Sequence, residues 1–340
     1  MGIVGSPILR SGTPAVESTS DPLNSDDSYQ LGQIWVNTTS KASFIMVGNT
    51  ASSAEWETVS NGDIVGGAGA NTGFVGGGSA TLDIIESYDL TTSANSVDHG
   101  DLTAGRRDVS GCSSSTDGFV NGGYTTVDVN TIDTFVFATT GNATDHGDLT
   151  VARRQLAGAS SSTDGFAMGG QSSATVIDKY TFSSASNAAD HGDLLNGNRK
   201  QSGHNSATDG FTAGGDTTAT NVINKFAFSS NTTAADHGDL LANNNWMAGT
   251  STSTQGFVAG GASSNVIQVF NFSSNVTATD HGDLTVARGA SAGSYSATQG
   301  FTAGGTSSDV IDVFTFATAA NATDHGDLTA TRSQMSGHQG

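Results

Sequence analysis

The chain has 340 residues, and its 32 acidic and 12 basic side chains give a net charge of −20 at pH 7. Such a charge repels phosphate backbones and anionic lipids, so we expect no nucleic-acid partner. Cys112 is the single cysteine, which excludes an intrachain disulfide and a cysteine-rich zinc site. No segment approaches the roughly 18 apolar residues of a membrane-spanning helix, and residues 1–10 carry no export signal, so membrane insertion is not expected.

Residues 1–58 precede the repeated part of the chain and are predicted to form a small β-rich module. Apolar segments with two tryptophans predict short strands over 31–39, 42–46 and 55–59. A module of this size buries little core, so we expect it to depend on oligomerisation or on a docking partner.

A repeat occupies the remainder, residues 59–340. The pentapeptide Asp-His-Gly-Asp-Leu occurs six times at steps of 47, 45, 46, 44 and 44 residues. Its histidines are His99, His146, His191, His237, His281 and His325. A period in the mid-forties, with 45 glycines and few strong helix formers, predicts an all-β fold, a six-bladed β-propeller with one four-stranded blade per period.

The unit 288–332 shows the four strands most clearly. Composition and turn residues place them at 290–297, 300–304, 310–316 and 325–329. The second strand carries a phenylalanine in every unit, which we expect to fill the space between blades: Phe74, Phe119, Phe166, Phe211, Phe257 and Phe301. Segments of the first type occur at 62–70 and at 334–340, and we expect the C-terminal one to close the ring beside the first unit.

The repeated Asp-His-Gly-Asp could be interpreted as a metal site. Adjacent copies belong to different blades, however, and calcium loops supply more acidic oxygens, so we expect structural hydrogen bonds, turn capping among them, and no metal or cofactor. An arginine follows the motif in five units, at Arg106 or Arg107, Arg153 or Arg154, Arg199, Arg288 and Arg332. A pair between this arginine and the motif's aspartate is attractive, but the fourth unit has Asn243-Asn244-Asn245-Trp246 instead and keeps the acidic motif.

Function is expected where the copies differ. One such position is the residue that follows the inner-strand glycine, and it is occupied by Cys112, His204, Thr250, Ser294 and His338, with Ala68 and Ala159. If the inner strands line the channel, these different side chains form a ring around it and could assemble a site. The simpler interpretation is a solvated channel wall. The other such place is the polar loop before the third strand, which suits glycan recognition and offers Tyr124, Gln171, Asp216, Asn221 and Asn265 as ligand-binding candidates.

Two parts of the sequence resemble phage structural proteins. Gly32-Gln-Ile-Trp-Val-Asn-Thr-Thr39 and the following strand resemble small domains of tailed-phage fibre and appendage proteins. Asp-His-Gly-Asp-Leu-Thr-Val-Ala-Arg, with Ser-Ser-Ser-Thr-Asp-Gly-Phe and a glycine pair, resembles the kelch-like propeller repeats of marine phages. The third strand has Phe where cellular kelch repeats have Tyr, and their Trp before the fourth strand is absent here.

The resemblance implies a non-enzymatic virion protein on the particle surface. As a tail-fibre or appendage subunit it would attach to other virion proteins through residues 1–58, most simply as a homotrimer, and its propeller would bind a host-surface glycan or protein. A head fibre or capsid decoration protein is the alternative. A glycan-active enzyme is the third hypothesis, although the sequence shows no cluster of non-repeated acidic or aromatic residues to support it.

Overall fold

A computed structural model describes residues 71–217, 221–262 and 264–339, together with the strands 16–18, 34–37, 43–50 and 53–59. The described residues form strands and turns without a helix, and so include no helix able to cross a bilayer. The chain divides into two units, Met1–Gly67 and Ala68–Gly340. The boundary predicted at 58/59 and the division at 67/68 enclose residues that, apart from Val59, lie outside the described part of the chain.

The first unit contains one four-stranded sheet. Its strands are β1 (Val16–Ser18), β2 (Ile34–Asn37), β3 (Ser43–Thr50) and β4 (Ser53–Val59), in that order. The last three confirm the predicted strands, and β1 adds a short parallel partner for β2 that the sequence did not indicate. Its three residues are too few for a periodic pattern.

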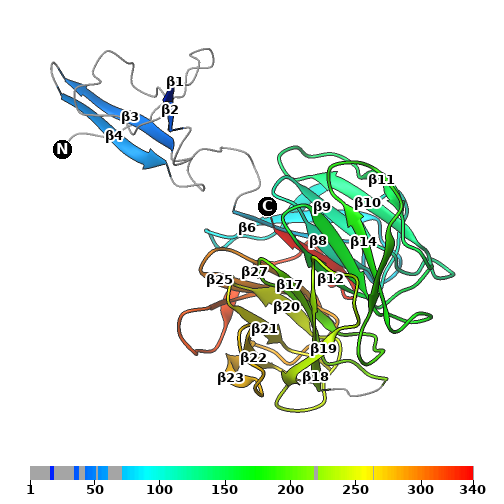
Figure 1. Cartoon of the computed structure of the whole chain (residues 1–340). Coiled ribbons are helices and arrows are strands. Elements are labelled where there is room, and N and C mark those ends of the chain that lie inside the picture. Colours follow the sequence, from blue (N-terminus) through cyan, green and yellow to red (C-terminus); the bar gives the residue numbers. More distant parts are fainter. Residues whose placement is uncertain are drawn as a thin grey trace. The chain divides into compact units, whose positions relative to one another are not determined.

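The second unit is a six-bladed β-propeller of four-stranded antiparallel sheets, as predicted (Figure 1). The inner strands, in blades 1 to 6, are β28 (Ser336–Gln339), β8 (Ser110–Ser113), β12 (Ala157–Ser160), β16 (Ser202–Asn205), β20 (Ala248–Ser251) and β24 (Ala292–Tyr295). The second strands are β5 (Thr72–Gly76), β9 (Asp117–Asn121), β13 (Asp164–Met168), β17 (Asp209–Ala213), β21 (Gln255–Ala259) and β25 (Gln299–Gly305).

The third and outer strands complete the blades. The third strands are β6 (Ile84–Asp89), β10 (Thr131–Val136), β14 (Val176–Thr181), β18 (Val222–Ala227), β22 (Val266–Asn271) and β26 (Ser308–Thr315). The outer strands, which contain the repeated pentapeptide, are β7 (Val97–Asp101), β11 (Thr144–Asp148), β15 (Ala189–Asp193), β19 (Ala235–Asp239), β23 (Thr279–Asp283) and β27 (Thr323–Asp327).

The ring closes through the C-terminus, as predicted. β28 pairs antiparallel with β5, so that His338 lies opposite Phe74, and blade 1 takes strands from both ends of the repeat. This pairing leaves β5 without a free edge. The competing segment, 62–70, lies outside the described residues.

Aromatic stacking holds neighbouring blades together. The second-strand phenylalanine of one blade stacks on a phenylalanine that follows the third strand of the next, as in Phe74–Phe137 and Phe211–Phe272, with ring centroids 4.7 and 4.4 Å apart. At the seam between blades 6 and 1, Leu90 shares the core cluster of Phe301. The prediction that these phenylalanines fill the interblade space is confirmed.

The repeated histidines bridge neighbouring blades. Each bonds through Nε2 to a backbone carbonyl oxygen of the next blade's third strand, from His99 to Val136 at 3.0 Å through to His325 and Asp89 at 2.7 Å. The motif's first aspartate accepts from the glycine amide, as Asp145 does from Gly147. Structural hydrogen bonding is therefore confirmed, but the histidine connects blades instead of capping a turn.

Candidate functional site

Six residues form a closed hydrogen-bonded ring where the chain enters the inner strands. They have φ between 58° and 63°, and they are Asp108, Gln155, Lys200, Trp246, Ala290 and Gln334. The backbone N–H of each donates to the carbonyl of the preceding member, and Asp108 closes the ring by donating to Gln334, with N–O distances of 2.7–3.0 Å. We call this end of the channel the linker mouth. The six residues share one backbone conformation, but apart from Gln155 and Gln334 their side chains differ. The linker mouth therefore presents different side chains at structurally equivalent positions.

Of the five residues predicted to line the channel, Cys112 and Thr250 belong to the lining of the cavity between the inner strands, and His204, Ser294 and His338 do not. The side chains of Cys112, His204, Thr250, Ser294 and His338 are at most 3 % exposed and lie in the packing between blades. A propeller's inner strand turns its edge to the channel and its two faces to the neighbouring blades, so these side chains meet protein instead of solvent.

Four of these side chains meet an aromatic residue of the next blade, and one of them is His204, which packs edge-on against Phe270. Ser294 Oγ lies 2.5 Å from the Tyr88 hydroxyl, and His338 packs edge-on against Phe135. Cys112 shares a core cluster with Tyr180, and its thiol contacts the carbonyl oxygen of Ala159 at 3.3 Å. Burial raises the pKa of that thiol, so it stays protonated. The unlike residues at this position therefore belong to the interblade packing.

Two of the buried histidines form Ser–His pairs. Nε2 of His204 lies 2.9 Å from Ser202 Oγ and its Nδ1 lies 3.1 Å from the Thr250 carbonyl oxygen; His338 repeats this arrangement with Ser336 and Cys112. A carbonyl oxygen can only accept, so Nδ1 carries the proton and Nε2 accepts from the serine. No substrate reaches these pairs, because both serines are also buried.

Acidification is expected to destabilise the propeller through these two histidines. Burial lowers the pKa of His204 and His338 to about 4 from 6.5. The unfolded chain therefore binds more protons between those values, so the stabilisation is complete above pH 6.5 and is lost as the pH falls towards 4. Full protonation of either histidine is expected to lower the free energy of unfolding by on the order of 3 kcal/mol. Urea unfolding of wild type and of His204→Gln from pH 7.5 to 4.5 measures this, and an unchanged pH slope in the variant would contradict it.

Buried ion pairs distinguish four blades from the other two. Arg153 Nη1 lies 2.9 Å from Asp178, both fully buried, and Thr150 Oγ1 donates to the same carboxylate at 2.6 Å. Equivalent sets occur in blades 1, 2 and 6: Thr329, Arg332 and Glu86; Thr103, Arg106 and Asp133; Thr285, Arg288 and Asp312. The acid sits at a β-bulge between the third and outer strands in each case, which turns its side chain inwards.

Blades 4 and 5 replace all three members together. Their sets are Leu195, Asn198 and Asn224, and Leu241, Asn244 and Gln268. Asn244 Nδ2 donates to the Gly260 carbonyl at 2.8 Å. The arginine's partner is thus the third-strand acid, and the expected pairing with the motif's aspartate is wrong. Arg199 is not equivalent to the buried arginines, because Asn198 takes their place.

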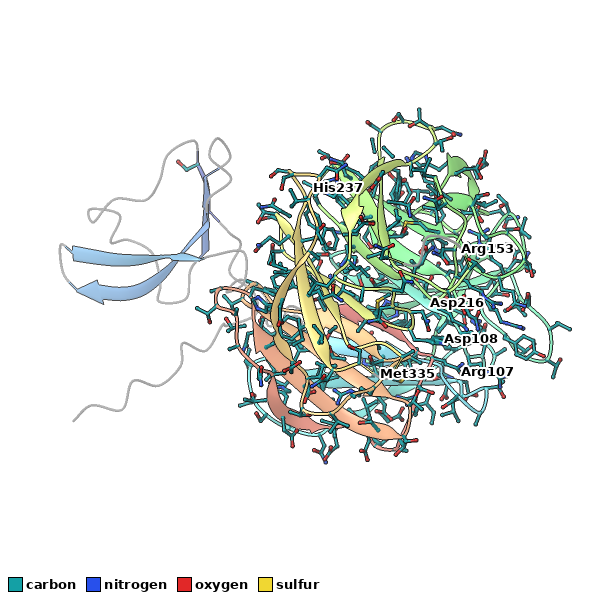
Figure 2. All side chains as sticks on the ribbon, turned by 90° about the horizontal axis from the view of Figure 1, so that it is seen from below. Arg107, Asp108, Arg153, Asp216, His237 and Met335 are labelled. Carbon is teal, nitrogen blue, oxygen red and sulfur yellow. The ribbon has the colours of Figure 1, made fainter. Side chains whose placement is uncertain are left out.

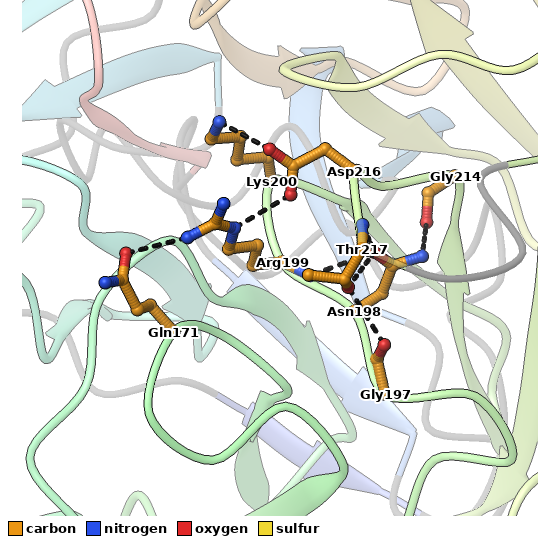
Figure 3. A network of polar contacts seen from close by, with 8 residues as sticks. All are labelled: Gln171, Gly197, Asn198, Arg199, Lys200, Gly214, Asp216 and Thr217. Atoms are coloured by element: carbon orange, nitrogen blue, oxygen red, sulfur yellow. Dashed lines mark hydrogen bonds and ion pairs between the residues drawn. The ribbon is translucent and has the colours of Figure 1, made fainter.

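Three of the predicted ligand-binding residues meet in a polar network at the linker mouth. The Tyr124 ring lies under the guanidinium groups of Arg107 and Arg154, at 5.0 and 4.4 Å. Gln171 accepts from Arg199 at 3.0 Å, and Asp216 pairs with Arg199 (Figure 3).

Asp216 also pairs with Lys200, which connects the network to a tryptophan. Lys200 Nζ lies 2.5 Å from Asp216 and 5.0 Å from the Trp246 ring centroid. Four of the chain's twelve basic residues therefore gather in this arc: Arg107, Arg154, Arg199 and Lys200. Figure 2 labels Arg107, Asp108 and Asp216 on the whole propeller. Asp108, Asp128 and Asp216 pair with these four basic side chains, so the arc is a network of ion pairs.

The other two predicted residues do not join this network. The backbone carbonyls of Asn221 and Asn265 accept from Leu240 and Leu284, a contact that every blade repeats. They belong to the frame of the blade. The mouth positions are a further candidate, and their signal in the sequence is that the residue two positions before each inner strand changes from blade to blade.

A hollow lies beside Trp246 on the side of the ring opposite the basic arc. It has a volume of about 430 Å³, and its lining includes Trp246, Arg288, Gly289, Ala290, Ser333 and Gln334. The opposite end of the channel opens into a depression of about 710 Å³ whose lining residues are all uncharged, mostly Ser and Thr of the repeated turns. At that end the last residue of the inner strands also varies, as Ser113, Ser160, Asn205, Ser251, Tyr295 and Gln339. The linker mouth differs from it by its charged side chains and its tryptophan, which makes the linker mouth the candidate site.

Across the described part of the chain, no group of three or more His, Cys, Asp or Glu is placed to hold a metal ion. No protein-family model matches the chain, and no curated protein matches it either.

Proposed function

We propose that this protein is a virion structural component of a tailed phage, an appendage subunit whose kelch-like propeller binds a host-surface glycan. The observation that carries the proposal is the linker mouth, where one repeated frame presents a basic arc, a tryptophan and a hollow. Rigid frames with unlike side chains at one end suit recognition. The resemblance of the repeat and of Gly32–Thr39 to phage proteins supports the virion assignment.

The proposed role is binding without catalysis. The charged side chains of the mouth pair with one another, as Arg154 does with Asp128 at 2.9 Å and Arg199 with Asp216 at 2.8 Å. Such pairs hold a surface in one shape, which lowers the ordering cost of binding. Residues 1–58 would attach the subunit, as a homotrimer, to other virion proteins on the particle.

Binding of the fluorescently labelled full chain to intact candidate host cells tests this function. We expect saturable binding that the unlabelled chain displaces, and no binding to cells of a strain resistant to the phage. Immunogold labelling of particles locates the protein in parallel. Labelling of the capsid without any cell binding would overturn the receptor-binding proposal in favour of a head fibre or decoration protein.

A further inference from the structure

The end of the channel opposite the linker mouth is uncharged, and we call it the neutral end. The last residues of the inner strands and the turns that follow them surround a depression of about 710 Å³, a volume within the range of small-molecule sites. Its described lining consists of Ser, Thr, Asn, Gln, Tyr and Ala. Such a lining gives a charged ligand no counter-ion, so the depression fits a neutral ligand with many hydroxyl groups.

The last residues of the six inner strands form the floor of the depression. All six also line the cavity inside the channel, so they lie where the two spaces meet. In one half of the floor, each backbone amide donates to a side chain of the next blade: Ser113 to Ser160 at 2.9 Å, Ser160 to Asn205 at 3.4 Å and Asn205 to Ser251 at 3.3 Å. Blades 2 to 5 therefore close this half with their own hydrogen bonds.

The other half of the floor is open. Tyr295 in blade 6 and Gln339 in blade 1 take the place that serine has in blades 2, 3 and 5. The Ser296 amide donates to the Gln299 carbonyl, so the Tyr295 amide, one residue earlier, points away from β25 and towards the channel. It finds no acceptor within the described residues. An amide in this position needs an oxygen atom from water or from a ligand.

Tyr295 also gives the floor an aromatic surface. Its hydroxyl interacts with the side chains of Asn205 in blade 4 and Gln339 in blade 1. Because Asn205 lies two blades away, the tyrosine side chain reaches across the end of the channel. An aromatic ring among hydroxyl and amide groups is a suitable environment for a sugar, whose C–H groups pack on the ring while its hydroxyls form hydrogen bonds.

The rim of the depression carries hydroxyl groups that are not engaged elsewhere. Ser115, Ser162 and Ser253 are exposed at the tips of their turns and form no hydrogen bond with any part of the chain that the structure describes. A serine hydroxyl can donate and accept, as the hydroxyl of a sugar can. The rim and the floor thus offer complementary groups to an uncharged polyol from several blades at once.

We propose that the neutral end binds an uncharged saccharide unit, at a second site that goes beyond the proposed function of the linker mouth. The C–H groups of the sugar contact Tyr295, and one of its hydroxyl oxygens accepts from the Tyr295 amide. Its other hydroxyls bond to the serines of the rim.

Calorimetry of the full chain with neutral oligosaccharides tests the site. The probes are oligomers of glucose, galactose, mannose and N-acetylglucosamine, each with a counterpart whose 6-hydroxymethyl groups are oxidised to carboxylates. We expect at least one neutral probe to bind and its oxidised counterpart to bind about tenfold or more weakly. Absence of binding to all neutral probes, or equal binding of the oxidised counterpart, would overturn the proposal.

Two variants test the site without disturbing the fold. Tyr295→Ser installs the residue that blades 2, 3 and 5 carry at this position, and it should weaken binding about tenfold or more. Ala207→Trp adds a bulky side chain at an exposed turn that lines the depression, and it should weaken binding as well. The matched control is Ala185→Trp, at an exposed turn outside the lining, which should bind as wild type does. Undiminished binding by Tyr295→Ser would refute the site.

Trp246→Ala distinguishes this site from the linker mouth. It should bind the neutral probe as wild type does, because Trp246 lies at the other end of the channel. A loss of oligosaccharide binding in Trp246→Ala but not in Tyr295→Ser would place the sugar at the linker mouth and overturn the proposal. Failure of the neutral-end site would leave the proposed function standing wherever host-cell binding survives Tyr295→Ser.

Discussion

Replacement of Arg153 alone by methionine is expected to destabilise the propeller by about 3–5 kcal/mol, because it leaves the fully buried Asp178 carboxylate without its cation. The remaining donors, the hydroxyl and amide of Thr150, do not offset a desolvated negative charge. Urea unfolding followed by circular dichroism measures the difference. Lys179→Met in the same blade removes a partly exposed pair with Asp164 and should cost no more than about 1 kcal/mol.

The triple variant Thr150→Leu/Arg153→Asn/Asp178→Gln should recover most of that loss. It copies the set of blade 5, where Leu241 N donates to Gln268 at 2.7 Å and no charge is buried. Replacing both partners of a buried pair by neutral groups is often close to neutral in stability. A triple variant as unstable as Arg153→Met would show that blades 3 and 5 do not share interchangeable frames.

The coupled exchange in blades 4 and 5 was readable in the sequence once the correct residues were aligned. Aligning Arg199 with the buried arginines concealed it, because Arg199 is one residue further along the chain than Asn198. The linker has the same length in every unit, because each φ-positive residue of the ring lies nine residues after the repeated histidine. Asn198 and the buried arginines each lie seven residues after the histidine of the repeated pentapeptide, so this spacing alone identifies Asn198 as their equivalent.

Repetition explains which features were predictable. The blades, the ring closure by 334–340 and the interblade phenylalanines each follow from a pattern that the chain repeats. The inner-strand positions could not be placed from the sequence, because their side chains contact residues of other blades. Ser294 and Tyr88 are 206 residues apart, and no local pattern indicates that the serine meets a tyrosine where Thr250 does not. Variation in a repeat can therefore reflect pairing with a neighbour as well as function.

The surroundings of Trp246 at the linker mouth also depend on residues of another blade. Trp246 was noted only as an interruption of the arginine pattern. Its significance depends on Ala290 and Gly289, more than forty residues later, whose small side chains open the space beside it. A hollow that forms where one repeat has small residues beside a large residue of its neighbour becomes apparent only when the repeats are arranged around the propeller.

The second large effect is expected at the glycines of the inner strands. Each approaches the same glycine of the preceding blade so closely that a Cβ atom would lie 2.0–2.4 Å from its carbonyl oxygen. The contacts run around the whole ring through Gly111, Gly158, Gly203, Gly249, Gly293 and Gly337. Backbone lies on both sides of each contact, so a methyl group can be accommodated only by moving one blade away from another.

Gly203→Ala should therefore destabilise the propeller by about 3 kcal/mol or more, at or above the upper end of the cost of overpacking. Its Cβ would lie 2.0 Å from the Gly158 carbonyl oxygen. Gly141→Ala is the matched control, since nothing lies within 4 Å of its added Cβ, and it should change stability by less than about 1 kcal/mol. Thermal and urea unfolding of both variants measure this difference.

The closed ring increases the effect of a single methyl group. An open array could absorb a shift at one interface by displacing its terminal units, whereas here β28 returns to β5 and the shift must be shared among six interfaces or must break one. The closure made by Ser336–Gln339 is the candidate for that break, because it is the one seam held by a strand from the far end of the chain. We therefore expect Gly203→Ala to raise hydrogen exchange in β28, although Gly203 lies in blade 4. Increased exchange confined to β12 and β16 would show instead that the propeller yields locally and that its interfaces act independently.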